Sequence, residues 1–522
     1  MNNQKTVYKQ FNYMITGLIA LMGVCSFWIF SRFTVDDAFI TWRYGKNLVD
    51  FGVWNYNPAD VDMTQAYTNP IYAVLSIVPN YFKIDVVFFF KILSLLYFVI
   101  FIIYMVKKTG KIKSILLFLA LPATMIHAFS GLETFLFVSL LSLLFISLYE
   151  YKFKSSIILT LILFLTRPES WLLAGLIPFY FLFKRLEIDF SNLKKSLSAV
   201  ISRGNLDWRN FFISSLIFVL FLGSYFIFHK WHFGYALPNT FYVKTGSSFA
   251  GFHLLLHYLY IFGFILILFF SSKYKLFLLF SCLFGAEIIS YIFSDLQMNY
   301  IDRFGFHIFA PIFFILLYVN MRLPNEKISK IFNFRIRSNY LINLVTILFV
   351  ISFNTYSKDE LIGISVYYPR AIDTHALLGK ELNKLKNNEG INSFSFGDAG
   401  MTAYHSEMIA LDNIGLGSSW VAKNKGVSQE IISLYKPDIV VTYNDNLNVY
   451  GQQELLKYAK NNNYMYLCQI SWQPGYYLGL YTSKKYTSLE KICQSSLEKN
   501  EISNKYYLKK IITHSPWSYW HE

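Results

Sequence analysis

Long apolar runs separated by short polar connections dominate the chain up to about residue 355. Eleven of these runs approach the length that an α-helix needs to cross a hydrocarbon core of about 30 Å. They cover residues 12–31, 87–106, 114–129, 132–149, 155–166, 171–183, 211–229, 253–270, 276–294, 306–320 and 340–353. The pattern predicts a polytopic α-helical membrane protein whose first apolar run is a retained helix rather than a cleaved signal peptide.

A further apolar run at residues 70–82, "PIYAVLSIVPNYF", covers only about two thirds of the length needed to span. The basic clusters decide how to interpret it, because Lys and Arg concentrate in cytoplasmic loops. These clusters lie at residues 107–113, 151–154, 183–195, 271–275 and 327–337. They share a side with Lys5 and Lys9 only if 70–82 does not span. We therefore predict an interfacial helix there, a cytoplasmic N-terminus and an extracytoplasmic C-terminal part.

Two domains follow from this topology. Residues 1–355 form the predicted transmembrane domain, with 32–86 as its first outer loop, and residues 356–522 form an extracytoplasmic domain. The segments "INSFSFGDAG", "KPDIVVTYN" and "GYYLGLYTS" are typical of short strands bounded by turn residues. Because "ALLGKELNKLKNN" between them favours a helix, the C-terminal domain is predicted to be a small α/β unit.

Composition and charge support a membrane protein. The chain of 522 residues is 54 % hydrophobic and only 15 % charged, with a mean hydropathy of +0.37, which is outside the range of soluble domains. Its net charge of +15 lies mainly in short clusters between apolar runs, which argues against a nucleic-acid partner. Cys468 and Cys493 fall in the exported part, where an oxidising compartment permits a disulfide, although their spacing alone does not decide it.

The polar connections that carry candidate chemistry all fall on the outer face. They include "SGLET" (130–134), "TRPES" (166–170), "HKWHFGYALPNTFYVK" (229–244) and "SDLQMNYIDRF" (294–304). With the first outer loop they supply Asp36, Asp37, Glu133, Arg167, Glu169, Lys244, Asp302 and Arg303. Such a mixed cluster suits a reaction in which cations hold a phosphate and a carboxylate activates a hydroxyl.

The adjacent carboxylates Asp36 and Asp37 have two interpretations. An Asp directly before "AFITWRYGKNL" can cap a helix by accepting from the free N–H groups of its first turn. Alternatively, one carboxylate does chemistry while its neighbour caps. If residues 37–49 are helical, Asp36, Phe39, Arg43 and Asn47 share one helical face, which favours Asp36 as the reactive group.

The stretch "DDAFITWRYGKNLVDFGVWNYNP", followed by "TNPIY", resembles the first outer loop of the GT-C glycosyltransferases, most closely the branch of the terminal arabinofuranosyltransferases of mycobacterial cell walls. "SGLET", "TRPES", "FGYALPNTFYVK", "DRF", "GDAG" and "ALDNIGL" follow in the order that this branch shows. Ser170 and Gly45 depart from its usual residues without touching the charged groups. The resemblance implies a GT-C fold of about eleven transmembrane helices with outer juxtamembrane helices and a C-terminal α/β periplasmic domain.

The resemblance also implies an activity: inverting transfer of a sugar from a polyprenyl-phosphate donor to a hydroxyl of an envelope glycan, glycolipid or exported protein at the bacterial inner membrane. Asp36 or Asp37 is then the general base. The candidates for holding the donor phosphate are Arg43, Arg167, Lys244 and Arg303. The candidates for binding substrate are Tyr44, Asn47, Glu133, Glu169, Trp231, Asn239, Tyr242 and Asp302.

Other interpretations stay open at this point. Each basic candidate is also explained as a cation that meets lipid head groups. A divalent metal is compatible with the family but is not specified by two adjacent aspartates. A lipid-linked glycan polymerase or ligase shares the many spans, whereas a transporter should carry more ionisable residues within its spans than Lys91, Glu287 and the nearby His127.

Overall fold

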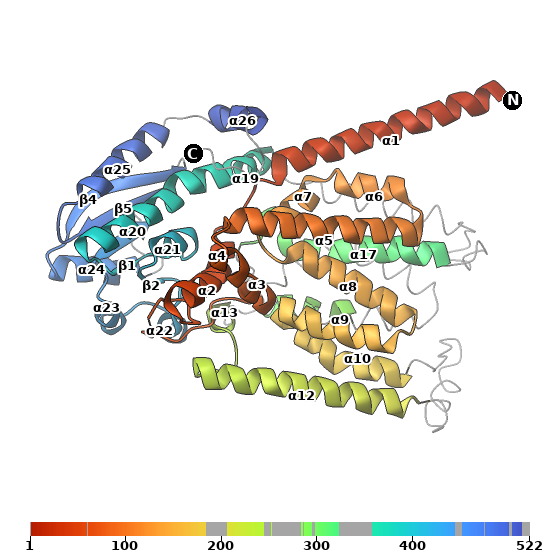
Figure 1. Ribbon diagram of the computed structural model, residues 1–522, viewed down its shortest axis with the longest axis horizontal. Helices are drawn as coiled ribbons and strands as arrows, with labels where there is room; N and C mark the ends of the chain where they lie inside the picture. Colours follow the sequence, from red (N-terminus) through yellow and green to blue (C-terminus); the bar gives the residue numbers. More distant parts are fainter. Residues whose placement is uncertain are drawn as a thin grey trace.

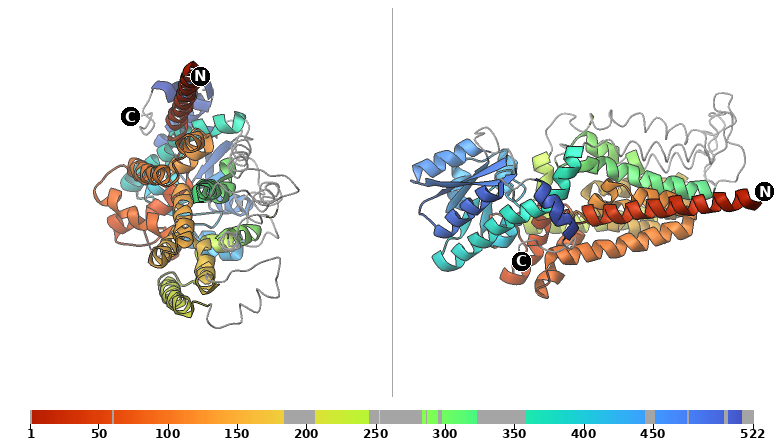
Figure 2. Two further views of the ribbon diagram at one scale, coloured as in Figure 1. Left: turned by 90° about the vertical axis from the view of Figure 1, so that its right-hand side faces the viewer. Right: turned by 90° about the horizontal axis from the view of Figure 1, so that it is seen from above.

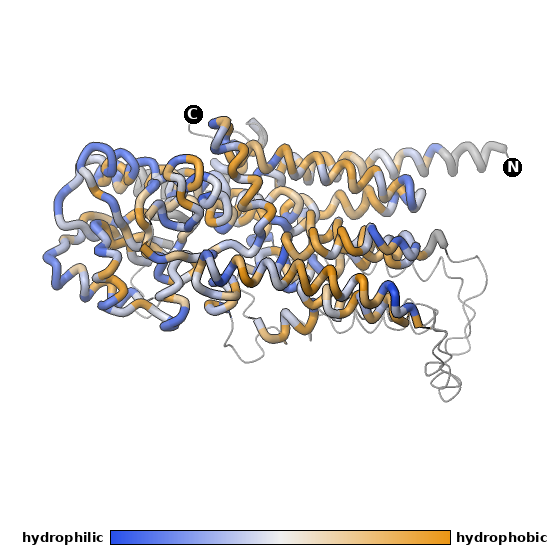
Figure 3. The backbone as a smooth tube through the Cα atoms, turned by 60° about the horizontal axis from the view of Figure 1, so that its bottom comes forward, coloured by the Kyte–Doolittle hydropathy of each residue, from blue (hydrophilic) through white to orange (hydrophobic). Residues whose placement is uncertain are grey.

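The computed structural model describes most of the chain. The described residues are 2–59, 61–183, 206–244, 252, 283–285, 287–294, 298–322, 358–443, 451–473, 476–500 and 504–513. Figure 1 shows a helical bundle on one side, a C-terminal α/β domain on the other, and short helices at the junction between them. In Figure 3 the bundle helices are predominantly hydrophobic along their length, whereas polar segments are frequent over the C-terminal domain. This distribution matches a membrane-embedded bundle that carries a water-exposed domain.

The bundle is built from helices that run roughly side by side (Figures 1 and 2). They are α1 (Asn2–Phe30), α5 (Val86–Thr109), α6 (Ile112–Leu119), α7 (Pro122–Phe129), α8 (Thr134–Tyr149), α9 (Phe153–Thr166), α10 (Trp171–Phe183), α12 (Trp208–Phe233) and α17 (Arg303–Arg322). Short 3₁₀ turns precede two of them, η1 (Pro168–Ser170) before α10 and η4 (Tyr300–Asp302) before α17.

Four described helical segments are long and apolar enough to cross a membrane: Tyr13–Phe30, Val86–Thr109, Trp208–Phe233 and Tyr300–Val319. The pair α6 and α7, bent by 73°, makes a fifth if it is one span. Helices α8, α9 and α10 are apolar but shorter. The predicted spans at 253–270 and 340–353 lie outside the described residues, as does part of 276–294, so the count of eleven stays a prediction.

The ambiguous run at 70–82 forms two short helices, α3 (Pro70–Leu75) of six residues and α4 (Ile77–Tyr81) of five. Neither is long enough to cross a core of about 30 Å. Asn69 caps α3, because its side chain accepts from the Tyr72 backbone N–H. Together with α2 (Asp37–Phe51), these helices lie at the junction between the bundle and the C-terminal domain (Figure 1).

The C-terminal domain is a mixed five-stranded sheet with helices around it. Its strands, in the order β2-β1-β3-β5-β4, are β2 (Ile409–Leu411), β1 (Ser393–Ser395), β3 (Ile439–Tyr443), β5 (Tyr476–Thr482) and β4 (Met465–Gln473). The pairs β1/β2 and β1/β3 are parallel, whereas β3/β5 and β4/β5 are antiparallel. The predicted α/β unit is confirmed, with the three predicted strands at β1, β3 and β5.

The helices of this domain come from the whole C-terminal segment. They are α19 (Lys358–Ala371), α20 (Leu377–Glu389), α21 (Met401–Ser406), α22 (Ser419–Asn424), α23 (Gln429–Tyr435), α24 (Gln452–Asn461), α25 (Thr487–Asn500) and α26 (Asn504–Thr513), with a π-helical turn η5 (Ile372–Ala376) between α19 and α20. A disulfide between Cys468 and Cys493 joins the edge strand β4 to α25. The domain boundary predicted near residue 355 lies outside the described residues.

The first outer loop and the C-terminal domain share one hydrophobic core. Ile40, Tyr44 and Tyr56 of the loop pack in the same cluster as Leu378 and Phe394 of the domain. At the opposite edge, α26 rests on the end of α1, where Trp28 and Arg32 both donate to the Ile511 carbonyl at 2.9 Å. The C-terminal domain is thus fastened to the bundle by residues far apart in sequence.

Candidate functional site

Six charged side chains meet where the bundle joins the C-terminal domain, and we call them the junction cluster. They are Asp37 at the start of α2, Glu133 before α8, Arg167 after α9, Glu169 in η1, Lys244 at the end of α13 (Asn239–Lys244) and Arg303 at the start of α17. Every one of them lies at the end of a helix, because the polar connections of a membrane bundle collect at its surfaces. The sequence prediction that these separate motifs converge agrees with this arrangement.

Arg167 and the two glutamates form the buried floor of the junction cluster. The Arg167 guanidinium donates from Nη1 to Glu133 Oε1 at 2.8 Å and from Nε to Glu169 Oε1 at 2.6 Å. Arg303 Nη2 lies 3.5 Å from the same Glu133 oxygen, and its Nε donates to Thr134 Oγ1 at 3.3 Å. Since all four charged side chains are less than a tenth exposed, these pairs fix one another's positions.

Asp37 and Lys244 are the two members that keep part of their surface exposed. Burial raises the pKa of the Asp37 carboxyl above its usual range, while the positive charges of Lys244 and Arg303 act against the shift. Burial likewise lowers the pKa of the Lys244 ammonium, opposed by the charge of Asp37. The cluster therefore presents one carboxylate of raised basicity beside two cations, which is what activation of a hydroxyl next to a phosphate requires.

Asp36 faces the C-terminal domain instead of the junction cluster. Its side chain makes no cap on α2, so the capping interpretation is wrong for its own helix. Its carboxylate accepts from the Gly400 N–H at 2.9 Å and the Met401 N–H at 2.7 Å. Those N–H groups lie at the start of α21, so Asp36 caps a helix that begins more than 360 residues further along the chain. The "GDAG" motif and the paired aspartates thus touch directly.

Two further polar side chains continue this contact, and sequence reasoning did not select them. His375 in η5 is fully buried, with Nδ1 at 3.6 Å from Asp36 Oδ1 and Nε2 at 3.6 Å from Asp398 Oδ2. The available signal was the "D" of the quoted "GDAG", which is Asp398. No local pattern marked His375, because it lies in a helical segment with no motif of its own.

The helical face that carries Arg43 and Asn47 is packed rather than open. Arg43 is 1 % exposed and donates from Nε to the Tyr56 carbonyl and from Nη2 to the Met408 carbonyl, both at 2.5 Å. Asn47 donates to the carbonyls of Asn55 and Tyr56 at 3.0 and 2.8 Å. The expected face exists, but loop 55–57 and the C-terminal domain cover it.

Tyr44 and Asn239 also connect separate segments of the chain through hydrogen bonds. The Tyr44 hydroxyl donates to the Thr64 carbonyl and accepts from the Ala66 N–H at 2.8 Å. The Asn239 amide donates to the carbonyls of Gly415, Leu416 and Ser418, which anchors α13 to the loop before α22.

The other predicted substrate-binding residues are placed differently. Trp231 is 78 % exposed near the end of α12, where its ring contacts Phe228. Tyr242 packs edge-on against Phe241 and Tyr235 in and beside α13. Asp302 ends η4 with a positive φ of 51°, directly before Arg303. The structure therefore brings Glu133 and Glu169 into the junction cluster but leaves Trp231 on the surface.

A second polar group lies beneath the junction cluster. Glu287 is fully buried close to Arg167. Nearby, the Tyr291 hydroxyl and His307 Nδ1 are 2.8 Å apart. Within the described ranges, no group of three or more His, Cys, Asp or Glu side chains is arranged to hold a metal ion.

Comparisons of the chain with protein-family models, with characterised proteins and with solved structures found no match.

Proposed function

We propose that this protein is a membrane glycosyltransferase that moves a sugar from a polyprenyl-phosphate donor to a hydroxyl of an envelope glycan, glycolipid or exported protein. The observation that carries the proposal is the position of Asp37 in the junction cluster, where burial raises the pKa of its carboxyl and the charges of Lys244 and Arg303 act against that shift. The ordered motifs that resemble the GT-C glycosyltransferases supply these same three residues. We place the reaction on the extracytoplasmic face of a bacterial inner membrane.

In the proposed reaction, the acceptor hydroxyl gives its proton to Asp37 as its oxygen attacks the anomeric carbon. The bond from that carbon to the phosphate oxygen breaks with inversion, and polyprenyl phosphate leaves with the electron pair. Lys244 and Arg303 stabilise the negative charge that grows on the phosphate. Glu133 and Glu169 hold Arg167, and through Glu133 they set the position of Arg303.

This proposal assigns different roles to the two aspartates. Both carboxylate oxygens of Asp36 already accept a backbone hydrogen bond from the start of α21, so the side chain is committed to the C-terminal domain. Asp37 has the cations of the cluster beside it. We therefore move the general base from Asp36, which the sequence favoured, to Asp37. Arg43 is left out of the phosphate site because its guanidinium is bonded to carbonyls within a packed face.

Two of the three ionisable residues noted for the transporter alternative, Lys91 and His127, have structural contacts. Lys91 Nζ donates to the carbonyls of Ser31 at 2.7 Å and Phe33 at 2.5 Å, and also to that of Phe129. His127 Nε2 lies 2.9 Å from the Ile301 carbonyl. Both side chains therefore join the ends of neighbouring helices, which favours a structural role for them over a role in a solute path. A polymerase or ligase stays the alternative within enzymes.

The test is complementation of cells that lack the protein, followed by mass spectrometry of their surface glycans. We expect both the wild-type chain and Asp36→Asn to restore the missing sugar, although not to the same level. Asp37→Asn should reduce transfer by about 10²–10⁴-fold relative to the wild-type chain. All three must be present in the membrane at equal amounts. Full restoration by Asp37→Asn would remove it as the base, and unchanged glycans in the deletion strain would contradict sugar transfer itself.

A further inference from the structure

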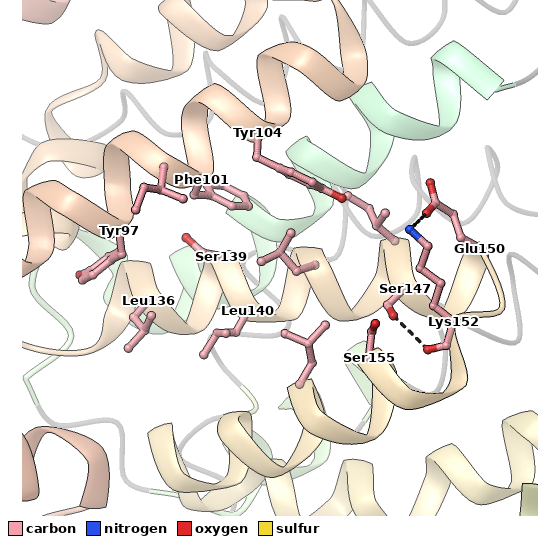
Figure 4. A pocket seen from close by; sticks show the side chains of 14 residues that line it. Tyr97, Phe101, Tyr104, Leu136, Ser139, Leu140, Ser147, Glu150, Lys152 and Ser155 are labelled. Carbon is pink, nitrogen blue, oxygen red and sulfur yellow. Dashed lines mark hydrogen bonds and ion pairs between the residues drawn. The ribbon is translucent and has the colours of Figure 1, made fainter.

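An apolar groove runs along the bundle, away from the junction cluster. It lies between α5, α8 and α9 and has a volume of about 410 Å³. Figure 4 shows Tyr97, Leu136 and Leu140 along its walls, with Glu150 and Lys152 at one end. Ile100 on its rim is 66 % exposed, so the groove opens sideways to the surroundings of the bundle.

The charged groups that line the groove, Glu150 and Lys152, lie at the end far from the C-terminal domain. Glu150 accepts from Lys108 at 3.1 Å and pairs with Lys152 at 2.6 Å, and the Tyr318 hydroxyl donates to it at 2.6 Å. Burial opposes ionisation of Glu150, but these hydrogen bonds prevail and lower its pKa to about 2. Two ammonium groups and one carboxylate leave a single net positive charge at this end, where Ser155 adds a hydroxyl.

The length and volume of the groove indicate the size of the hydrocarbon chain that fits into it. Its lining extends along α8 from Leu136 to the C-cap residue Glu150, which corresponds to about 21 Å along a helix. Because a methylene group fills roughly the volume of a water molecule, about 30 Å³, the groove holds roughly 14 of them. That is one fatty-acyl chain. The proposed function places the phosphate of a polyprenyl donor at the opposite end of the bundle.

We propose that the groove binds an anionic phospholipid, with one acyl chain between α5, α8 and α9 and its phosphate at Lys108, Lys152 and Ser155. The single positive charge complements the single negative charge of a phosphodiester. In the proposed topology this end faces the cytoplasm, so the lipid comes from the inner leaflet. This site is independent of sugar transfer, because none of its residues belongs to the junction cluster.

The test is titration of the full-length, detergent-purified and delipidated chain with phosphatidylglycerol, followed by native mass spectrometry. We expect one tightly bound lipid, bound more weakly by about 30-fold in Lys108→Gln/Lys152→Gln, since each lysine near a lipid surface contributes about 1 kcal/mol. Leu143→Trp fills the groove, and displacing even two methylene groups weakens binding by about tenfold. The matched controls are Lys107→Gln, on an exposed lysine beside Lys108, and Ile158→Trp, on the exposed side of α9.

Equal affinity in the site variants and their controls would overturn the proposal. So would a tight complex with undecaprenyl phosphate that Leu143→Trp disrupts while phosphatidylglycerol binding is unchanged, because that result assigns the groove to the sugar donor. If Leu143→Trp fails to fold, the lysine pair still decides the question, since both side chains lie at the bundle surface.

Discussion

At the scale of single residues, Gly400 shows how closely the two parts of the molecule fit. A Cβ atom at this position would lie 2.1 Å from the Asp36 carbonyl oxygen and 2.4 Å from its Oδ2. We predict that Gly400→Ala forces α21 away from Asp36 and lowers the free energy of unfolding by about 1–3 kcal/mol, as other overpacked sites do. Thermal unfolding in detergent measures this loss.

The control for Gly400 is Gly363→Ala in α19, where an added Cβ meets nothing within 4 Å. Alanine favours a helix over glycine by about 1 kcal/mol, so this variant should be as stable as the wild type or more so. An unfolding temperature that is the same for Gly400→Ala and the wild type would show that the contact with Asp36 is not tight.

The raised pKa of Asp37 predicts the pH dependence of transfer. A base must be deprotonated, so kcat/KM should fall as the pH drops through a value above 3.8, the ordinary pKa of an Asp carboxyl. Lys244→Met removes a charge that opposes the shift, and its acidic limb should therefore move to still higher pH. Lys230→Met, at an exposed lysine of α12, is the control and should leave the limb in place. The opposite movement in Lys244→Met would contradict this electrostatic assignment.

At the scale of elements, the disulfide secures the edge of the sheet. Cys468 lies on β4, the outermost strand, and Cys493 is buried in α25. The bridge closes a loop of 25 residues, and we predict that Cys493→Ser lowers the stability of the C-terminal domain by about 2–4 kcal/mol. Chemical denaturation checks this value. Cys25→Ser, on an exposed free cysteine of α1, should have no effect.

The sequence predicts elements better than it predicts their partners. The helix expected over 37–49 forms at 37–51, because its apolar period and polar start are local signals. The same period indicates the face that bears Arg43 but says nothing about what covers it, and the Met408 carbonyl that it contacts is 365 residues away. Strand β2 was missed because three apolar residues show no alternation. Strand β4 was missed although apolar and polar residues alternate from Cys468 to Gln473, which is a local strand signal.

The candidate site was likewise predictable in its location but not in its detailed contacts. The convergence of Glu133, Arg167, Lys244 and Arg303 was predictable, because topology places helix ends on one face of a membrane. The choice between Asp36 and Asp37 was not, since it depends on the Gly400 and Met401 N–H groups that engage only one of them. Adjacent residues on a helix point in directions about 100° apart. Asp36 and Asp37 therefore face different partners, and this difference separates their roles.

At the scale of the whole molecule, orientation in the membrane is the property most open to test. We predict that a membrane-impermeant maleimide labels Lys384→Cys in intact cells, because this side chain is 64 % exposed on the C-terminal domain. Lys113→Cys, at the other end of the bundle, should react only after the cells are permeabilised. Both variants are made in a chain with Cys25→Ser and Cys282→Ser. Labelling of both positions in intact cells would contradict the proposed topology.

The shared core of the first loop and the C-terminal domain also sets an order of events during synthesis. Asp36 and Gly400 are separated by 364 residues, which a ribosome needs about 20–70 s to add at 5–20 residues per second. In the proposed topology, Tyr44, Tyr56 and Asp36 spend that interval outside the cytoplasm without the C-terminal domain that buries them. With that topology, the nascent loop would present an incomplete surface to extracytoplasmic chaperones and proteases until residue 400 has been added.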